Sequence, residues 1–131
     1  NILEQGSGPK PLLIAVTVLT SMEAIDLHAV GIDHTPEQQV LKLARLTHSC
    51  GLDGIVCSAQ EAKLMRTEFG KDFCLVTPGI RLESSPVDDQ RRTLTPAAAI
   101  AVGSSYLVIG RPITQSIDPV ATCHSIIQSL A

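Results

Sequence analysis

Two short segments combine glycine with arginine directly after an apolar run. They are LVTPGIR, which contains Gly79 and Arg81, and LVIGRPIT, which contains Gly110 and Arg111. Glycine lets a backbone N–H group approach an anion closely, and a guanidinium can bind two phosphate oxygens at once. These residue types predict a phosphate site. The alternative is that glycine and proline only turn the chain and that the arginines are solvated.

Both segments follow apolar, β-branched runs that are typical of strands buried on both faces. Strands are expected at residues 11–18, 54–58, 73–77 and 106–110. In phosphate-binding barrels of parallel strands, the anion commonly lies at the loops after the last two strands. The two glycine-arginine segments follow the third and fourth runs, which agrees with this placement.

Helical start and stop signals separate the strands. Thr35 before Pro36 predicts an N-cap with proline in the first turn, and Gly51 predicts the end of that helix. Ser58 with Glu61 predicts a capping box at the start of another helix. Helices are expected at residues 21–31, 36–51, 59–69, 96–103 and 119–130, with loops at about 82–94 and at 111–116. The loop at 82–94 is long and polar enough to form a lid.

Strands and helices alternate four times, which predicts an α/β fold with parallel strands and right-handed crossovers. A doubly wound sheet and a (β/α)8 barrel both fit this order. Four strands cannot close a barrel. They leave two apolar sheet edges that must pair with other strands or aggregate.

The composition argues against several classes of protein. Hydrophobic residues make up 44% of the 131 residues, which is enough to bury a core. The net charge of -3, without a basic stripe, argues against nucleic-acid binding. No apolar run reaches the ~20 residues of a membrane-spanning helix. The first residues, NILEQGSGPKP, do not match a signal peptide.

Cysteine and histidine spacing predicts neither disulfides nor a metal site. The cysteines lack CxxC spacing and are expected to be reduced, mostly buried thiols of a cytoplasmic protein. The histidines form no ligand pair at helical spacing, so roles on the surface or in helix packing are expected. The residues concerned are Cys50, Cys57, Cys74, Cys123, His28, His34, His48 and His124.

Five segments together resemble the successive strand-end signatures of bacterial orotidine 5'-monophosphate decarboxylases, in the order and spacing of that family. They are VTVLTS (16–21), GLDGIVCSAQEA (51–62), LVTPGIR (75–81), DDQRRTLTP (88–96) and YLVIGRPIT (106–114). The resemblance implies a (β/α)8 TIM-barrel fold. Residues 1–131 would supply strands five to eight, the C-terminal half of a single barrel domain.

The resemblance also implies roles for individual residues. Arg111 and Gly110 match the phosphate-binding arginine and the glycine before it, and Arg81 matches a second substrate-contacting arginine. Gln90 matches a lid glutamine that reaches both the phosphate and the pyrimidine. Its amide can donate to one group and accept from another. Thr20 matches a contact beside the base, although it could instead neighbour a helix N-cap at residue 21.

Two further arginines of the lid segment are expected to have roles other than substrate binding. Arg91 and Arg92 are expected to be surface or salt-bridging residues. The charged run in which they lie contains no periodic apolar face.

The chain departs from the family in its catalytic residues. The family's Asp and Lys array, with a D-x-K-x-x-D motif, lies in the first half of the barrel and has no counterpart here. In the family, a lysine ammonium protonates C6 of the pyrimidine as carbon dioxide leaves. No catalytic residue is therefore assigned to this chain.

The resemblance also implies the ligands and partners. The implied ligand is OMP or UMP, and no cofactor is implied. The protein is expected to be a homodimer and to need the N-terminal half barrel for activity. Two alternatives remain open. One is another phosphate-binding barrel, such as 3-keto-gulonate-phosphate decarboxylase. The other is a non-catalytic half barrel that self-associates through its open edges.

Overall fold

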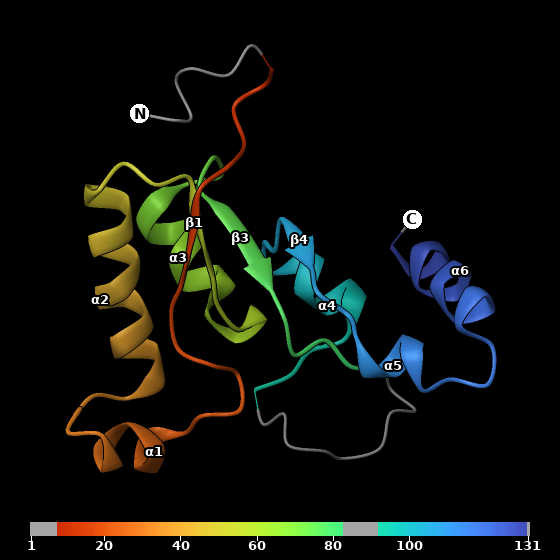
Figure 1. Ribbon diagram of the computed structural model, residues 1–131, viewed down its shortest axis with the longest axis horizontal. Coiled ribbons are helices and arrows are strands. Elements are labelled where there is room, and N and C mark those ends of the chain that lie inside the picture. Colours follow the sequence, from red (N-terminus) through yellow and green to blue (C-terminus); the bar gives the residue numbers. More distant parts are fainter. Residues whose placement is uncertain (1–7, 83–91, 131) are drawn as a thin grey trace.

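A sheet of four parallel strands forms the centre of the molecule (Figure 1), for which a computed structural model describes residues 8–82 and 92–130. The strands are β1 (Ile14–Val16), β2 (Gly54–Val56), β3 (Cys74–Thr77) and β4 (Tyr106–Leu107). Each strand pairs in parallel with the next one along the chain. A (β/α)8 barrel has this sequential order, whereas a doubly wound sheet reverses its strand order at a switch point. The predicted parallel α/β architecture is confirmed.

The strands are shorter than the apolar runs that predicted them. Strand β1 covers three residues of the run at 11–18. Its register with β2 begins at Ile14. Just before it, the Leu13 carbonyl accepts from the Asp53 N–H at 2.8 Å, whereas the Leu13 N–H donates to the Asp53 carboxylate at 2.7 Å rather than to a strand carbonyl. Pro11 also has no N–H to donate.

The two faces of the sheet differ in burial. On one face, Ile55 and Leu75 occupy one register row and are fully buried. On the other face, the next row contains Val16, which is 64% exposed, and Tyr106, which is 58% exposed. Side chains alternate between the faces of a strand, so one face of this sheet is covered and the other is largely open.

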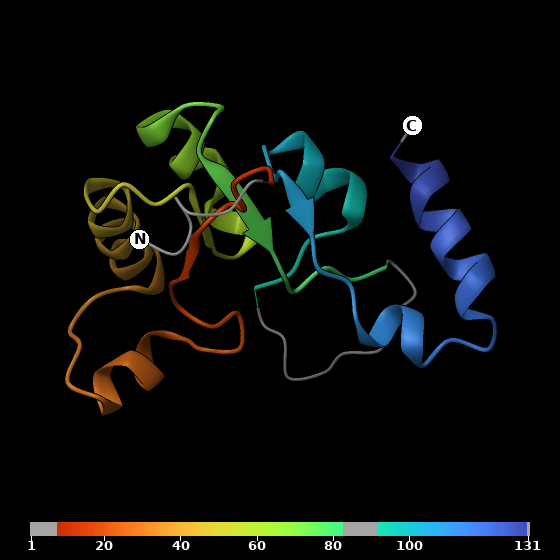
Figure 2. The ribbon, with the colours of Figure 1, turned by 45° about the horizontal axis from the view of Figure 1, so that its top comes forward.

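Helices follow each strand, as in successive β/α units (Figures 1 and 2). The helices are α1 (Ala24–Ala29), α2 (Pro36–Ser49), the 3-10 helix η2 (Ala59–Glu61), α3 (Ala62–Phe69), α4 (Pro96–Ala101), α5 (Arg111–Thr114) and α6 (Pro119–Ser129). Apolar side chains of three helices cover the buried face of the sheet. Leu27 of α1, Val40 of α2 and Met65 of α3 belong to one buried cluster with Ile55 and Leu75.

Three predicted helix starts are confirmed by their capping bonds. The Thr35 hydroxyl accepts from the Gln38 N–H, and the Thr95 hydroxyl accepts from the Ala98 N–H. The Asp118 carboxylate accepts from the Ala121 N–H at 2.9 Å. In each case proline follows the cap, and the helix begins at the residue that the sequence predicted.

Two predicted helix boundaries were wrong. The first helix begins at Ala24 rather than at residue 21, because the Glu23 N–H is held by the Asp26 carboxylate and makes Glu23 the cap. The predicted loop at 111–116 contains helix α5. Its start at Arg111 follows a cap at Gly110 that offers no side chain to detect in the sequence.

The predicted capping box at Ser58 was only half right. The Ser58 hydroxyl does accept from the Gln60 N–H, but the element it caps is the 3-10 helix η2. The Glu61 carboxylate forms an ion pair with Arg92. Glu61 therefore bonds a charged residue thirty-one positions away along the chain rather than its local backbone partner.

Cysteine burial is uneven. All four cysteines are free thiols, and Cys57 and Cys74 are buried, but Cys50 is exposed. Among the described residues, no helix combines the length and the apolar character that crossing a membrane requires.

Candidate functional site

The carboxyl ends of the four strands lie along one edge of the sheet, because all four strands are parallel. The segments that leave this edge begin at Thr17, Cys57, Pro78 and Val108. Ligands of parallel α/β proteins bind at this end of the strands. The predicted site residues Thr20, Arg81, Gly110 and Arg111 all belong to these segments.

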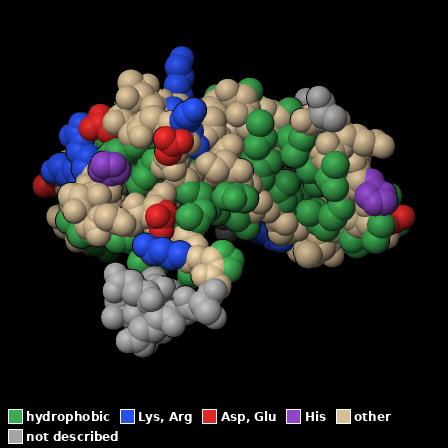
Figure 3. Space-filling model, turned by 90° about the horizontal axis from the view of Figure 1, so that it is seen from above, with side chains coloured by type: hydrophobic (Ala, Val, Ile, Leu, Met, Phe, Trp, Pro, Cys, Tyr) green, Lys and Arg blue, Asp and Glu red, His purple; other side chains and the backbone are tan. Residues whose placement is uncertain are grey.

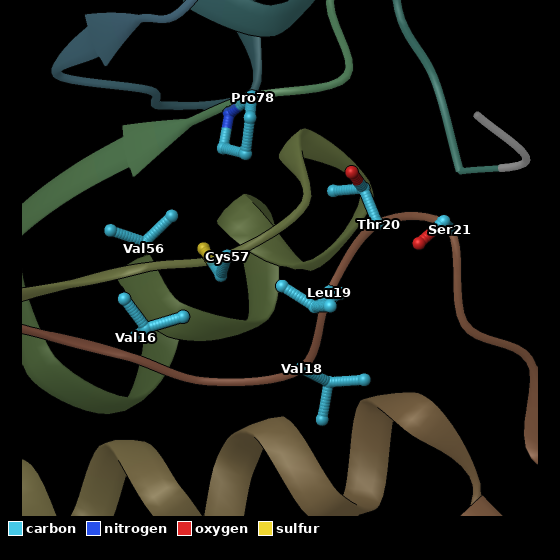
Figure 4. A pocket seen from close by; sticks show the side chains of 8 residues that line it. All are labelled: Val16, Val18, Leu19, Thr20, Ser21, Val56, Cys57 and Pro78. Atoms are coloured by element: carbon cyan, nitrogen blue, oxygen red, sulfur yellow. The ribbon is translucent and has the colours of Figure 1, made fainter. Parts of the chain in front are cut away.

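A pocket of about 300 Å³ lies where β1, β2 and β3 end (Figure 4). Its walls are mostly apolar, and two hydroxyl residues, Thr20 and Ser21, lie at one end of it. The lining residues are Val16, Val18, Leu19, Thr20, Ser21, Val56, Cys57 and Pro78. Apolar walls with a few polar groups are typical of sites that bind small organic molecules.

Thr20 is a buried residue of the turn after β1 and lines this pocket. Its carbonyl oxygen accepts from the Arg92 N–H at 3.4 Å. The helix that follows is capped by Glu23, so the alternative that Thr20 neighbours a helix N-cap at Ser21 is wrong.

Arg92 joins the turns that form the pocket through both its side chain and its backbone. Its guanidinium is paired with Glu61 and donates to the carbonyl oxygen of Leu19 at 2.9 Å. The Arg92 carbonyl accepts from the Ser58 hydroxyl at 3.0 Å. The side chains of Arg92 and Glu61 are only 11% and 4% exposed. The prediction that Arg92 forms a salt bridge is confirmed, and its burial in this site was missed.

Arg81 lies in the segment after β3. Gly79 just before it has φ +75°, the left-handed conformation that glycine at a turn favours. The Arg81 N–H donates to the Leu94 carbonyl at 3.0 Å, and its guanidinium donates to the Ile80 carbonyl at 2.8 Å. The backbone of this segment is therefore tied to the residues that precede α4.

Gly110 caps α5 and Arg111 is its first residue, and residues 108–109 separate them from β4. The Gly110 carbonyl accepts from the N–H groups of Ile113 and Thr114 at 2.8 and 3.0 Å. A Cβ atom on Gly110 would meet no atom within 4 Å, so the space beside its backbone is open. An open backbone next to an arginine is the arrangement that the phosphate prediction requires.

The predicted site residues differ in their position relative to the pocket. Thr20 lines the pocket, whereas Arg81, Gly110 and Arg111 are not among its lining residues, although they leave the same edge of the sheet. A shared phosphate site for the two arginines stays a prediction. Gln90, Arg91 and most of the predicted lid at 82–94 lie outside the described residues.

Cys57 is a pocket residue that the sequence did not single out. Burial raises the pKa of its thiol to about 12, although Arg92 and Arg66 oppose this shift. The thiol is therefore protonated near neutral pH and contributes an apolar wall rather than a nucleophile. Its only signal in the sequence was its place near the end of a predicted apolar strand, which buried cysteines share.

Comparisons with known proteins identify relatives of the chain. Residues 1–126 match the family model described as orotidine 5'-phosphate decarboxylase / HUMPS family. The chain is 62% identical over 126 residues to an orotidine 5'-phosphate decarboxylase of Chromobacterium violaceum, covering 96% of the chain and 51% of that protein. It is 59% identical to one of Glaesserella parasuis, covering 99% of the chain and 56% of that protein. The chain spans about half the length of the curated relatives it matches.

A solved structure agrees with this result. The crystal structure of orotidine 5'-phosphate decarboxylase from Lactobacillus acidophilus matches with a TM-score of 0.76 and 36% identity, covering 95% of the chain and 51% of that structure. The four β/α units thus form about half of a (β/α)8 barrel. The chain belongs to the orotidine 5'-phosphate decarboxylase / HUMPS family.

Proposed function

We propose that this chain is the C-terminal half of an enzyme that decarboxylates orotidine 5'-monophosphate to UMP in pyrimidine biosynthesis. The identity of 62% to the Chromobacterium violaceum decarboxylase, over nearly the whole chain, carries the proposal. The parallel strand order and the pocket at the carboxyl ends of the strands support it.

The chain has a binding role in this proposal. Arg111, Gly110 and Arg81 hold the phosphate, and Thr20 lies beside the pyrimidine in the apolar pocket. Gln90, on a lid at about 82–94, bonds both the phosphate and the base. The Asp and Lys groups that expel carbon dioxide come from the N-terminal half of the barrel. Closure over the phosphate excludes water and orders the site.

The open face of the sheet supports the need for the N-terminal half. Val16, Tyr106 and Val108 are each about half exposed or more. Helix α6 adds Val120 and Ile127, which are 66% and 65% exposed. Figure 3 presents hydrophobic side chains gathered over the middle of the molecule and toward its α6 side. Apolar surface of this extent favours association, and the missing strands and helices of a barrel would bury it.

The complete protein is proposed to be a cytoplasmic homodimer. The free thiols support a reducing compartment, since cysteines of oxidising compartments commonly form disulfides. Sedimentation analysis of the complete protein tests the dimer, and a monomer at the concentration of the assay would contradict it.

Turnover by a complete barrel tests the activity. We would join this chain to the N-terminal half of the Chromobacterium violaceum relative and refer to the product as the joined barrel. The joined barrel is expected to form UMP and carbon dioxide from OMP without an added cofactor. Turnover of 3-keto-gulonate phosphate in place of OMP would assign the chain to the other decarboxylase. Specific UMP binding without turnover of either substrate would refute the enzymatic role.

The chain without a partner tests the non-catalytic alternative. Size-exclusion chromatography and a UMP titration are made on residues 1–131 and on the joined barrel. The chain by itself is expected to self-associate, and the joined barrel to bind UMP. A half barrel with a purely structural role would give no specific UMP affinity in either form.

A further inference from the structure

The Arg92–Glu61 pair is distinctive because almost none of it reaches solvent. The Arg92 side chain is 11% exposed and the Glu61 side chain is 4% exposed. The chain offers a contrasting pair in Arg45 and Glu68, whose side chains are 57% and 33% exposed. Charges leave water at a high cost, so a buried pair contributes little net stability compared with well-packed apolar residues. Its presence beside the pocket therefore calls for an account other than stability.

The hydrogen bonds of Arg92 provide that account. Its guanidinium donates to the carbonyl oxygens of Val18 at 3.4 Å and of Leu19 at 2.9 Å. The backbone N–H of Arg92 donates to the carbonyl oxygen of Thr20 at 3.4 Å. Arg92 thus contacts three consecutive carbonyls of the turn after β1. All three residues of this turn line the pocket.

Arg92 also bonds the turn after β2, which contributes Cys57 to the pocket. The Ser58 hydroxyl donates to the Arg92 carbonyl at 3.0 Å, and Ser58 directly follows the lining residue Cys57. Glu61, the last residue of η2, pairs with the other terminal nitrogen of the guanidinium. Arg92 therefore bonds the two turns that follow β1 and β2.

We infer that Arg92, anchored by Glu61, is a positioning residue that fixes the Val18–Thr20 turn in the geometry required for nucleotide binding. This inference rests on the proposed function. Arg92 itself does not line the pocket. Its planar guanidinium can bond a carboxylate and backbone carbonyls at the same time, which a lysine ammonium does less well.

A double variant separates positioning from stability. In the joined barrel, Arg92→Met alone leaves Glu61 buried without its partner and is expected to lower the melting temperature. Adding Glu61→Met removes the unpaired charge and is expected to restore that temperature. The carbonyls of Val18 and Leu19 still lack the donor that the guanidinium supplied, whereas the backbone bonds of residue 92 to Thr20 and Ser58 remain. The UMP dissociation constant is therefore expected to stay raised by about tenfold or more.

Two further variants complete the set. Arg92→Lys keeps the positive charge beside Glu61 and is expected to fold, but with weaker UMP binding than the parent barrel. It keeps the inference testable if the double variant does not fold. Arg45→Met removes an exposed pair that does not line the pocket and is expected to change neither property.

Amide hydrogen exchange tests the inference without a ligand. Exchange at Leu19, Thr20 and Ser21 is expected to be faster in Arg92→Lys and in the double variant than in the parent. If the parent does not bind UMP but exchange rises as expected, the proposed function fails and the positioning of the turn stands. If the parent binds UMP and the folded variants bind it equally well, the inference is overturned and the proposed function stands.

Discussion

A Cβ atom on Gly54 would lie 2.1 Å from the carbonyl oxygen of Cys74, which is far inside van der Waals contact. The two residues are register partners in the parallel pair of β2 and β3. Only glycine allows the two strands to approach in this way.

Gly54→Ala is therefore expected to destabilise the joined barrel by about 3 kcal/mol, because backbone rather than a flexible side chain meets the new methyl group. Urea unfolding measures the change. Gly8→Ala is the control, since a Cβ atom there meets nothing within 4 Å. Equal urea midpoints for Gly54→Ala and Gly8→Ala would contradict the close approach of the β2 and β3 backbones at Gly54.

Arg66 is expected to be the arginine with the largest effect on stability. It donates to the carbonyl of Gly103 at 2.8 Å, to that of Gly70 at 3.0 Å and to the Ser105 hydroxyl at 2.8 Å, so it ties α3 to the loops before β3 and β4. Arg66→Met is expected to lower the free energy of unfolding by about 3 kcal/mol, since the carbonyls of Gly103 and Phe73 lose their donor in part-buried bonds.

Arg45→Met is the matched control for Arg66. The Arg45–Glu68 pair is exposed, and such pairs contribute about 1 kcal/mol or less. Both variants lose the same charge and gain the same side chain. If the two lose equal stability, the loss reflects the change in charge rather than the bonds that Arg66 makes.

The helix starts marked by a side-chain cap before proline were well predicted, because their signals are local. Thr35, Thr95 and Asp118 each stand directly before a proline and cap the next turn with their own side chain. The cap at Gly110 has no side chain, and the helix after it was missed for that reason.

The candidate site was predicted where one segment carries the signal and missed where distant segments meet. The glycine-arginine segments were visible because each combines both residue types within a few positions. The Glu61–Arg92 pair joins residues 31 positions apart, and Glu61 also satisfied a local capping pattern. The Glu61 carboxylate could bond either its local capping partner or the distant Arg92, and the sequence reveals only the local partner.

The Cys57 thiol predicts a loss of stability at alkaline pH. Burial raises its pKa to about 12 in the folded chain from a usual value near 9.0. Between these values the unfolded chain releases a proton that the folded chain retains, so the free energy of unfolding falls as pH rises from about 9 to 12. The slope from this one group approaches about 1.4 kcal/mol per pH unit.

Comparison with Cys57→Ala isolates this contribution. Urea unfolding of the joined barrel at pH 8 to 10.5 is expected to show a shallower alkaline decline for the variant than for the parent. In a folded sample, a thiol reagent is expected to modify exposed Cys50 well before buried Cys57. Parallel declines for parent and variant would mean that Cys57 titrates normally in the folded chain.

Arg111 is expected to recognise the phosphate and not the base. It follows β4 beside the open backbone of Gly110, on a different segment from the pocket that Thr20 lines. Arg111→Ala is therefore expected to weaken UMP binding to the joined barrel by about 2 to 3 kcal/mol, the range of hydrogen bonds to a charged group. Uridine, which has no phosphate, is expected to bind the parent and the variant equally.

Calorimetric titration with both ligands decides between a phosphate contact and a general loss of structure. A phosphate contact affects UMP only, because uridine lacks the phosphate. Arg81→Ala extends the comparison to the segment after β3, and a smaller effect on the same ligand is expected, since its guanidinium also donates to the Ile80 carbonyl. If uridine and UMP weaken together in Arg111→Ala, the arginine supports the fold of the pocket and the phosphate lies elsewhere.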